Sequence, residues 1–180
     1  MSLNELEFTA LRQTIAIRGT ARVILLLVAL LGWSALTMVL LLFSSIPVAA
    51  VYPLAVLAAG FEAIHALHVG VERIGRYLQV YFEAEADGPR WETTAMRVGP
   101  ALPGGGSDPL FTVVFASAAV LNLIPALLPE PTPIELGVLL ALHLAFVIRV
   151  VRARGAAARQ RAVELETFRA LKSGVAETKP

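Results

Sequence analysis

The sequence predicts an all-α membrane protein that crosses a bilayer four times, as two helical hairpins. Hydrophobic residues make up 57% of the 180 residues and charged residues only 16%, whereas a soluble domain carries about a quarter charged residues. Apolar stretches of bilayer length recur along the chain, and a helix needs about 20 such residues to cross the hydrocarbon core. All fifteen basic residues lie outside the two short turns that join these stretches.

Four segments have the length and composition of membrane spans: residues 23–43, 46–71, 109–128 and 134–151. The first holds 21 residues without a charge, whereas the apolar core of a cleaved signal peptide has roughly 7–15. We therefore expect it to be a retained span. The second contains one formally charged residue, Glu62. The fourth carries Glu135 and Arg149 near its ends, from which their side chains can extend toward the headgroups.

Proline-containing turns, residues 44–47 and 129–133, join the segments in pairs. Proline is tolerated in the first turn of a helix but not in its interior, so each turn ends one helix and starts the next. The basic residues lie before the first span, between the second and third, and from Arg149 onward. Because Lys and Arg stay on the cytoplasmic side, we expect both termini and the 72–108 loop to be cytoplasmic. Thirteen of the fifteen basic residues are Arg, which we interpret as a GC-rich bacterial genome and hence a bacterial inner membrane.

The segments outside the spans are predicted to be largely helical. Residues 2–18 form an amphipathic helix that starts with a Ser2/Glu5 capping box, and it lies either on the membrane or on the protein's own loop. The second span and the 152–180 tail continue as helical extensions that pack together or against partner chains. In the tail, Arg161/Glu164 and Glu166/Arg169 have the spacing of ion pairs within one helix. Ser107 or Asp108 is expected to cap the third span.

The second span and its extension carry most of the candidate functional residues. At 100° per residue, Glu62, His65, Glu72 and Arg76 fall within a band of about 80°, with His68 at its edge. A carboxylate inside a span costs about 2.5–3.5 kcal/mol on insertion scales, so the band should face other helices or another subunit. The leading interpretation is structural, with Glu62 protonated or paired to an arginine. The complete candidate set is Glu62, His65, His68, Glu72, Arg73, Arg76, Asn122 and His143.

Metal and haem sites are alternative interpretations of the histidines. Glu62 and His65 have the spacing of two metal ligands on one helix face, with His68 nearby, but no other span repeats the pattern. A haem between His65 or His68 and His143 would have to bridge a difference in depth of about 13 Å. We therefore expect no cofactor. Asn122 and His143 are expected to form hydrogen bonds between helices.

The leading functional prediction is a non-enzymatic membrane subunit that forms a homo-oligomer or joins a larger membrane complex. Without cysteine, the chain has no disulfides, thiol redox chemistry, Cys-ligated zinc or iron–sulfur clusters. The first alternative is an ion channel or small transporter lined by the Glu62–Arg76 helix face, because intramembrane ionisable groups often mark such paths. The second is a metal- or haem-binding membrane enzyme. The expected partners are the bilayer and other membrane subunits, and no nucleic acid.

Overall fold

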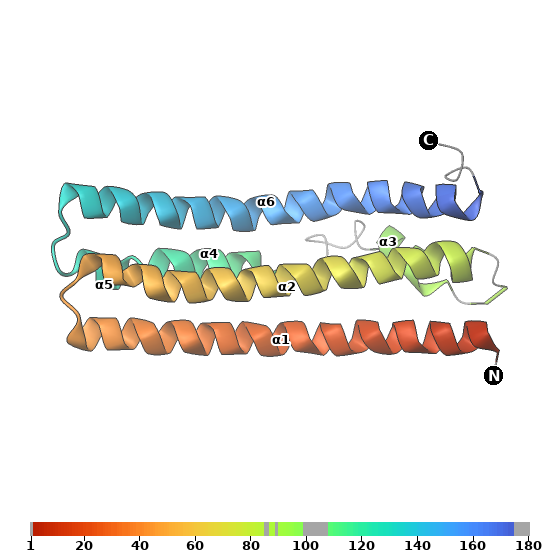
Figure 1. The fold of residues 1–180 in the computed structure, drawn as a ribbon, viewed down its shortest axis with the longest axis horizontal. Coiled ribbons are helices and arrows are strands. Elements are labelled where there is room, and N and C mark those ends of the chain that lie inside the picture. The colour runs from red at the N-terminus through yellow and green to blue at the C-terminus, as the bar shows by residue number, and fades with distance from the viewer. Residues whose placement is uncertain (1, 85–86, 89, 99–107, 175–180) are drawn as a thin grey trace. The chain divides into compact units, whose positions relative to one another are not determined.

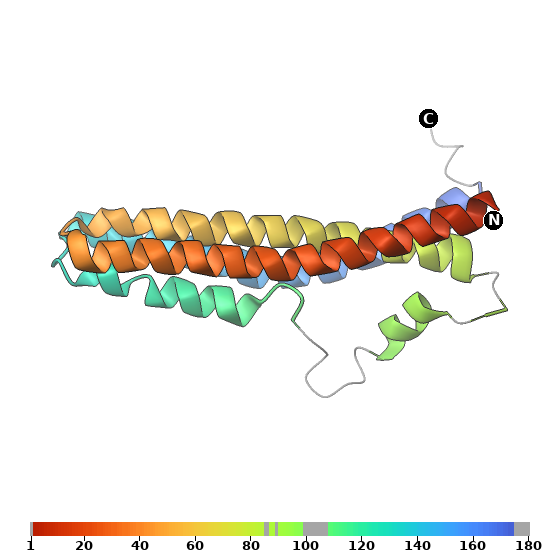
Figure 2. The ribbon, with the colours of Figure 1, turned by 90° about the horizontal axis from the view of Figure 1, so that it is seen from below.

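A computed structural model of the chain describes residues 2–84, 87–88, 90–98 and 108–174. Every regular element within these ranges is helical, and they contain no strand, which confirms the predicted all-α class. The elements, shown in Figures 1 and 2, are α1 (Leu3–Phe43), the 3₁₀-helix η1 (Pro47–Ala50), α2 (Val51–Leu78), the π-helix η2 (Gln79–Glu83), α3 (Trp91–Val98), α4 (Thr112–Leu121), α5 (Ile124–Leu127) and α6 (Pro133–Lys172).

Three helices in the described part of the chain are long and apolar enough to cross a bilayer: α1, the helical stretch Pro47–Glu83 and α6. The segment predicted as the third span is shorter and interrupted, because α4 ends at Leu121 and α5 begins only at Ile124. Pro125 explains the break, since it has no N–H to donate to the Leu121 carbonyl and its ring crowds that carbonyl. The arrangement of four spans as two hairpins therefore stays a prediction.

The start of α4 differs from the expected capped helix at Pro109. The helix begins at Thr112, and its N-cap residue Phe111 has φ 51° and no capping side-chain hydrogen bond. Asp108 lies three residues before this N-cap position, and Ser107 lies outside the described residues. The left-handed conformation of Phe111 accompanies burial of its neighbour Leu110, which is 1% exposed in the core. Packing thus decides where this helix starts.

The N-terminal amphipathic segment is part of α1 rather than a separate helix. Gly19 lies inside α1, and a single glycine costs a helix only about 1 kcal/mol. The capping box is confirmed. The Ser2 N–H donates to Glu5 Oε2 at 2.7 Å, and the Glu5 N–H donates to Ser2 Oγ at 3.3 Å. These two bonds satisfy N–H groups that the first turn of a helix otherwise leaves without partners.

The chain divides into two compact units. Unit 1 comprises residues 1–20, 67–109 and 156–180, and unit 2 comprises residues 21–66 and 110–155. The helices α1, α2 and α6 each contribute residues to both units.

Unit 2 has an apolar core to which α1, α2, α4 and α6 all contribute. Phe61, Phe115 and Phe146 meet edge to face at its centre, with ring centroids 5.4 to 6.5 Å apart. Gly60 lets α1 and α2 approach closely, since a Cβ there would collide with the Cβ of Ala29. Small residues at such crossings are typical of helix packing in membranes, where close van der Waals contact replaces the hydrophobic effect.

Unit 1 is held together by aromatic rings and buried charged groups. The ring of Phe8 on α1 lies 5.6 Å from that of Phe82, and Tyr77 lies 5.8 Å from Phe168 on α6. Tyr77 also donates to Glu7 at 2.8 Å. The first residues of α1 therefore pack on the protein's own helices, as one of the two alternatives for the amphipathic segment predicted.

Candidate functional site

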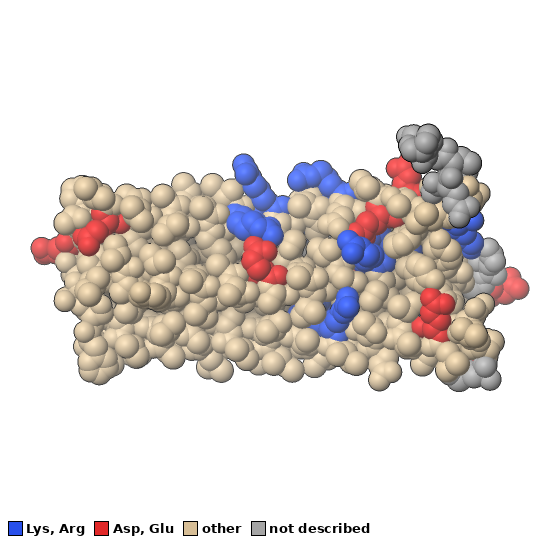
Figure 3. Space-filling view, viewed as in Figure 1, with Lys and Arg blue, Asp and Glu red and all other residues tan. Residues whose placement is uncertain are grey.

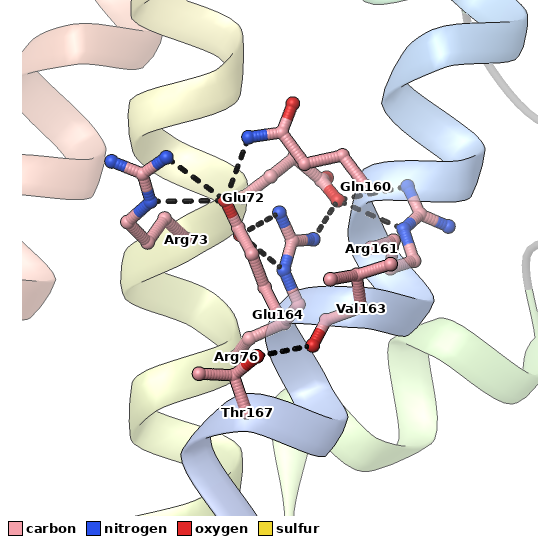
Figure 4. Close-up of polar contacts among 8 residues, drawn as sticks. All are labelled: Glu72, Arg73, Arg76, Gln160, Arg161, Val163, Glu164 and Thr167. Carbon is pink, nitrogen blue, oxygen red and sulfur yellow. Dashed lines mark hydrogen bonds and ion pairs between the residues drawn. The ribbon is translucent and has the colours of Figure 1, made fainter. Parts of the chain in front are cut away.

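Arg76 is the centre of an ion-pair network between α2 and α6 in unit 1 (Figure 4). Its side chain is only 3% exposed. The Nε and Nη2 groups donate to Oε2 of Glu164 at 2.9 and 2.7 Å, and Nη1 donates to Oε2 of Glu72 at 2.9 Å. One buried guanidinium thus joins carboxylates from two helices, with short bonds that are typical of strong charge-assisted pairs.

Each carboxylate of this network has further donors (Figure 4). Glu164 also accepts from Arg73 Nε at 3.0 Å and from Gln160 Nε2 at 2.8 Å, while Glu72 accepts from Arg161 Nε at 3.0 Å. Burial opposes ionisation of Glu164, but the hydrogen bonds from the two arginines and Gln160 outweigh it and lower the pKa of its carboxyl. Arg161 and Glu164 thus both bind α2, whereas the sequence predicted a pair within the tail helix. For Glu164 the reason is that the facing helix offers the guanidinium of Arg76, which is only 3% exposed.

A second buried carboxylate, that of Glu83, fixes the N-terminus of α3. It is 4% exposed. It accepts from the N–H of Glu92 at 2.7 Å, the N–H of Thr93 at 2.9 Å and the Thr93 hydroxyl at 2.9 Å. A carboxylate suits this position, because the first N–H groups of a helix lack partners and carry partial positive charge. Arg12 from α1 approaches Glu83 at 3.8 Å and donates to Glu92 at 2.6 Å. Burial nevertheless raises the pKa of Glu92 above its ordinary value.

Asn122 and His143 belong to a buried hydrogen-bond network in unit 2. Trp33 on α1 donates to Asn122 Oδ1 at 3.0 Å, and Asn122 Nδ2 donates to the Ala50 carbonyl at 2.8 Å. The same Nδ2 lies 3.0 Å from His143 Nε2, while His143 Nδ1 lies 2.7 Å from the Leu139 carbonyl. An amide nitrogen can only donate, so Nε2 accepts and Nδ1 carries the proton. This tautomer satisfies every contact of the network, which links α1, η1, the end of α4 and α6.

Glu62 forms an ion pair on the outer surface of unit 2. Arg149 Nη2 donates to Glu62 Oε2 at 2.8 Å, and the two side chains are 42% and 50% exposed. His65 Nδ1 lies 3.4 Å from the same Nη2, and its ring stacks on Phe61. This pairing agrees with one of the two states expected for Glu62. This ion pair is exposed on the surface of unit 2, whereas the Arg76 side chain is buried.

The predicted polar band is therefore divided between the two units. Glu62 and His65 lie in unit 2, whereas His68, Glu72, Arg73 and Arg76 lie in unit 1. His68 is 5% exposed. Among the described residues, no three His, Cys, Asp or Glu side chains gather closely enough to hold a metal ion.

Several residues of these networks are absent from the set that the sequence singled out: Trp33, Glu83, Gln160, Arg161 and Glu164. Trp33, Arg161 and Glu164 bind partners 88 or 89 positions away, which no local spacing indicates. Glu83 binds the start of the next helix, nine and ten positions on, and Gln160 binds Glu164 four positions along the same helix. Comparisons with protein-family models, curated proteins and solved structures found no match. The networks themselves show what these groups do chemically. Their donors and acceptors satisfy one another and hold helices in register, as closed polar networks do in buried sites.

Proposed function

We propose that the chain is a membrane subunit of the bacterial inner membrane that spans the bilayer four times and assembles with copies of itself. The termini and the 72–108 loop lie in the cytoplasm, and the subunit is not an enzyme. The distribution of charge supports this topology. In Figure 3, Lys and Arg side chains appear over α6 from about its middle onward, whereas the surface over its N-terminal part carries only acidic charges near the end. Basic residues on one side of the spans indicate the cytoplasmic side.

The observation that carries self-assembly is the half-exposed Glu62–Arg149 pair, which follows uncharged stretches of both helices, residues 44–61 and 136–148. Glu62 lies well inside the predicted second span, and a charged group at the centre of a span costs about 2.5–3.5 kcal/mol on translocon scales, so it faces other protein or water rather than lipid. The pair carries both signs, so a two-fold axis can bring Glu62 of one copy close to Arg149 of the other. A two-fold interface uses the same patch on both subunits, which this self-complementary pair satisfies.

Small residues next to this pair favour close approach of a second copy. Ala55 and Ala59 precede Glu62 on α2, Ala141 and Ala145 precede Arg149 on α6, and all four are exposed. The spacing places each pair of alanines on the same helix stripe as the charged residue that follows. Small residues four apart let membrane helices pack backbone to backbone. We call these four alanines together with Glu62 and Arg149 the α2–α6 face.

Cysteine crosslinking in native membranes tests the proposal, because the natural chain contains no cysteine. We expect Ala59→Cys to form an oxidised dimer. The matched control is Leu31→Cys on α1, which is 70% exposed in the same unit but outside the α2–α6 face. The mass of the protein in mild detergent should be a multiple of 19.2 kDa.

Two results would count against self-assembly: a monomeric mass together with no Ala59→Cys dimer, or equal dimer yields from both positions. The predicted channel lined by the Glu62–Arg76 face has no comparable support. Glu72, Arg73 and Arg76 all bind Glu164 or each other within unit 1.

A further inference from the structure

A pocket of about 380 Å³ opens in unit 1 among η2, the segment that starts α3 and the last turn of α6. Its floor is partly apolar, with Val80 and Ala84 among the lining residues. Small-molecule sites commonly have volumes of roughly 300–1,000 Å³ and combine apolar walls with a few polar groups. The pocket is therefore large enough for a small metabolite.

The pocket lining carries a positive charge. Arg90, Arg169 and Lys172 contribute three cations, and Glu83 contributes one carboxylate. Both oxygens of Glu83 already accept hydrogen bonds from the start of α3, and Arg12 lies 3.8 Å from one of them. The carboxylate is thus occupied by the protein itself, and the formal charges of these four lining side chains sum to +2.

Two of the cations differ in a way that suits ligand binding. Lys172 Nζ donates to the Val80 carbonyl at 3.0 Å and lies 5.8 Å above the Tyr81 ring, so it is held in place beside the floor. Arg169 is exposed and makes no ion pair with any of the described residues. A fixed cation and an available guanidinium fork form a complementary pair for an oxyanion, because Arg binds phosphate in a bidentate manner and Lys acts as a point charge.

The backbone beside the pocket is also unusual. Gln79 opens η2, and a π-turn within a longer helix frequently marks a functional site. Gln79 is one of the lining residues, and its side-chain oxygen Oε1 is buried and has no hydrogen-bond partner among the described residues. A buried acceptor without a partner costs about 1–3 kcal/mol, so a donor supplied by a ligand would remove that cost.

From these observations we infer that the pocket binds a small anion that carries a phosphate group and a hydroxyl or amine donor. Its cations would hold the phosphate, and Gln79 Oε1 would accept from the donor. The phosphate can come from a soluble metabolite or from a lipid headgroup. On the proposed topology, Glu83 lies about 18 Å along the helix beyond Val71, the end of the second span, at ~1.5 Å per residue. The headgroup layer is only about 5–7 Å thick on each side, so the distance favours a soluble ligand.

Calorimetric titration of the full-length protein with pyrophosphate, in phosphatidylcholine nanodiscs, tests this inference. We expect saturable binding with one site per chain. Arg169→Gln should weaken it about tenfold or more, because a lost charge-assisted hydrogen bond changes affinity on that scale. The control is Arg159→Gln, which removes an exposed arginine from the same helix and unit but lies outside the pocket. Its affinity should stay within about twofold of the natural protein.

Absence of saturable pyrophosphate binding would overturn the inference. An equal loss of affinity in Arg169→Gln and Arg159→Gln would also overturn it, because it would indicate nonspecific attraction of anions. Nanodiscs that contain phosphatidylglycerol distinguish the two sources of phosphate. If this lipid competes with pyrophosphate in the natural protein, a headgroup is the ligand, and if it does not, the ligand is soluble. The outcome is separate from self-assembly, because the α2–α6 face lies in unit 2 and can fail its crosslinking test while pyrophosphate still binds.

Discussion

Replacement of Arg76 by glutamine should selectively loosen unit 1. Arg76 is 3% exposed and makes three hydrogen bonds of 2.7 to 2.9 Å to Glu164 and Glu72. Removal of one partner from a buried ion pair costs about 3–5 kcal/mol, because the remaining charge loses its compensation. Here Arg73 and Arg161 still bind the two carboxylates, so we expect the low end of that range, about 3 kcal/mol.

Arg73→Gln is a matched control for this substitution. Arg73 binds the same carboxylate of Glu164 at 2.9 Å, but its side chain is 56% exposed. Exposed ion pairs contribute about 0–1 kcal/mol, since water screens them and the side chains lose entropy. The two variants remove the same charge from the same network and differ mainly in burial.

Amide hydrogen exchange of the full-length protein in nanodiscs measures the effect, with peptides from residues 156–172 as the readout. Local opening that becomes easier by about 3 kcal/mol accelerates exchange roughly a hundredfold, while about 0.5 kcal/mol accelerates it about twofold. We expect the larger change in Arg76→Gln and the smaller one in Arg73→Gln. Equal acceleration in the two variants would refute the argument that burial gives Arg76 its importance.

Three further predictions concern the two cores. Asn122→Ala should destabilise unit 2 by about 2 kcal/mol, because three hydrogen bonds would be lost and such bonds in membranes average about 0.6 kcal/mol each. Thr37→Val is the control and should not destabilise the unit, because the buried Thr37 hydroxyl has no partner among the described residues. Unfolding of the two variants in mixed SDS micelles compares their stabilities. Gly60→Ala should destabilise the same unit by about 1–3 kcal/mol through collision with Ala29, and Ala29→Gly should restore stability in that assay; failure of this rescue would contradict the close approach of α1 and α2. Because the folded pKa of Glu164 lies below its ordinary value of 4.5, its contribution is complete above about pH 4.5 and is lost as the pH falls below that. The difference in thermal midpoint between the natural protein and Glu164→Gln should therefore shrink between pH 6 and pH 3.5, and a constant difference would disprove it.

The fold was predictable to the extent that it depends on local chemistry. The Ser2/Glu5 capping box forms as its spacing indicates, and helices fill the apolar segments and their charged extensions. The interruption at Pro125 was also available from the sequence, because proline in a helix interior removes a hydrogen bond wherever it stands. A second capping box, between Thr132 and Glu135 at the start of α6, follows the same local rule, and it gives Glu135 a role in the turn.

The candidate site was predictable only in part. The sequence identified Arg76 and Asn122 as polar groups that need partners, because unpaired polar groups are costly in an apolar environment. It did not identify Trp33, which binds Asn122 from 89 positions away, and it paired Glu164 with Arg161 rather than with Arg76, which lies 88 positions away. A partner on another helix depends on the rotation of both helices, which no local spacing contains.

The sequence alone determined that this chain is helical and rich in bilayer-length apolar segments, with no basic residue in the two short turns that join those segments. Those properties follow from composition and local hydrogen bonding, which act on each segment separately. Tertiary structure alone decided that Arg76 is buried while Arg73 is exposed, that Glu62 meets Arg149 at the surface, and that Gln79 lines a basic pocket. The physical reason is that the energy of a charge depends on how much water and which counter-charges surround it, and only the packed helices determine both.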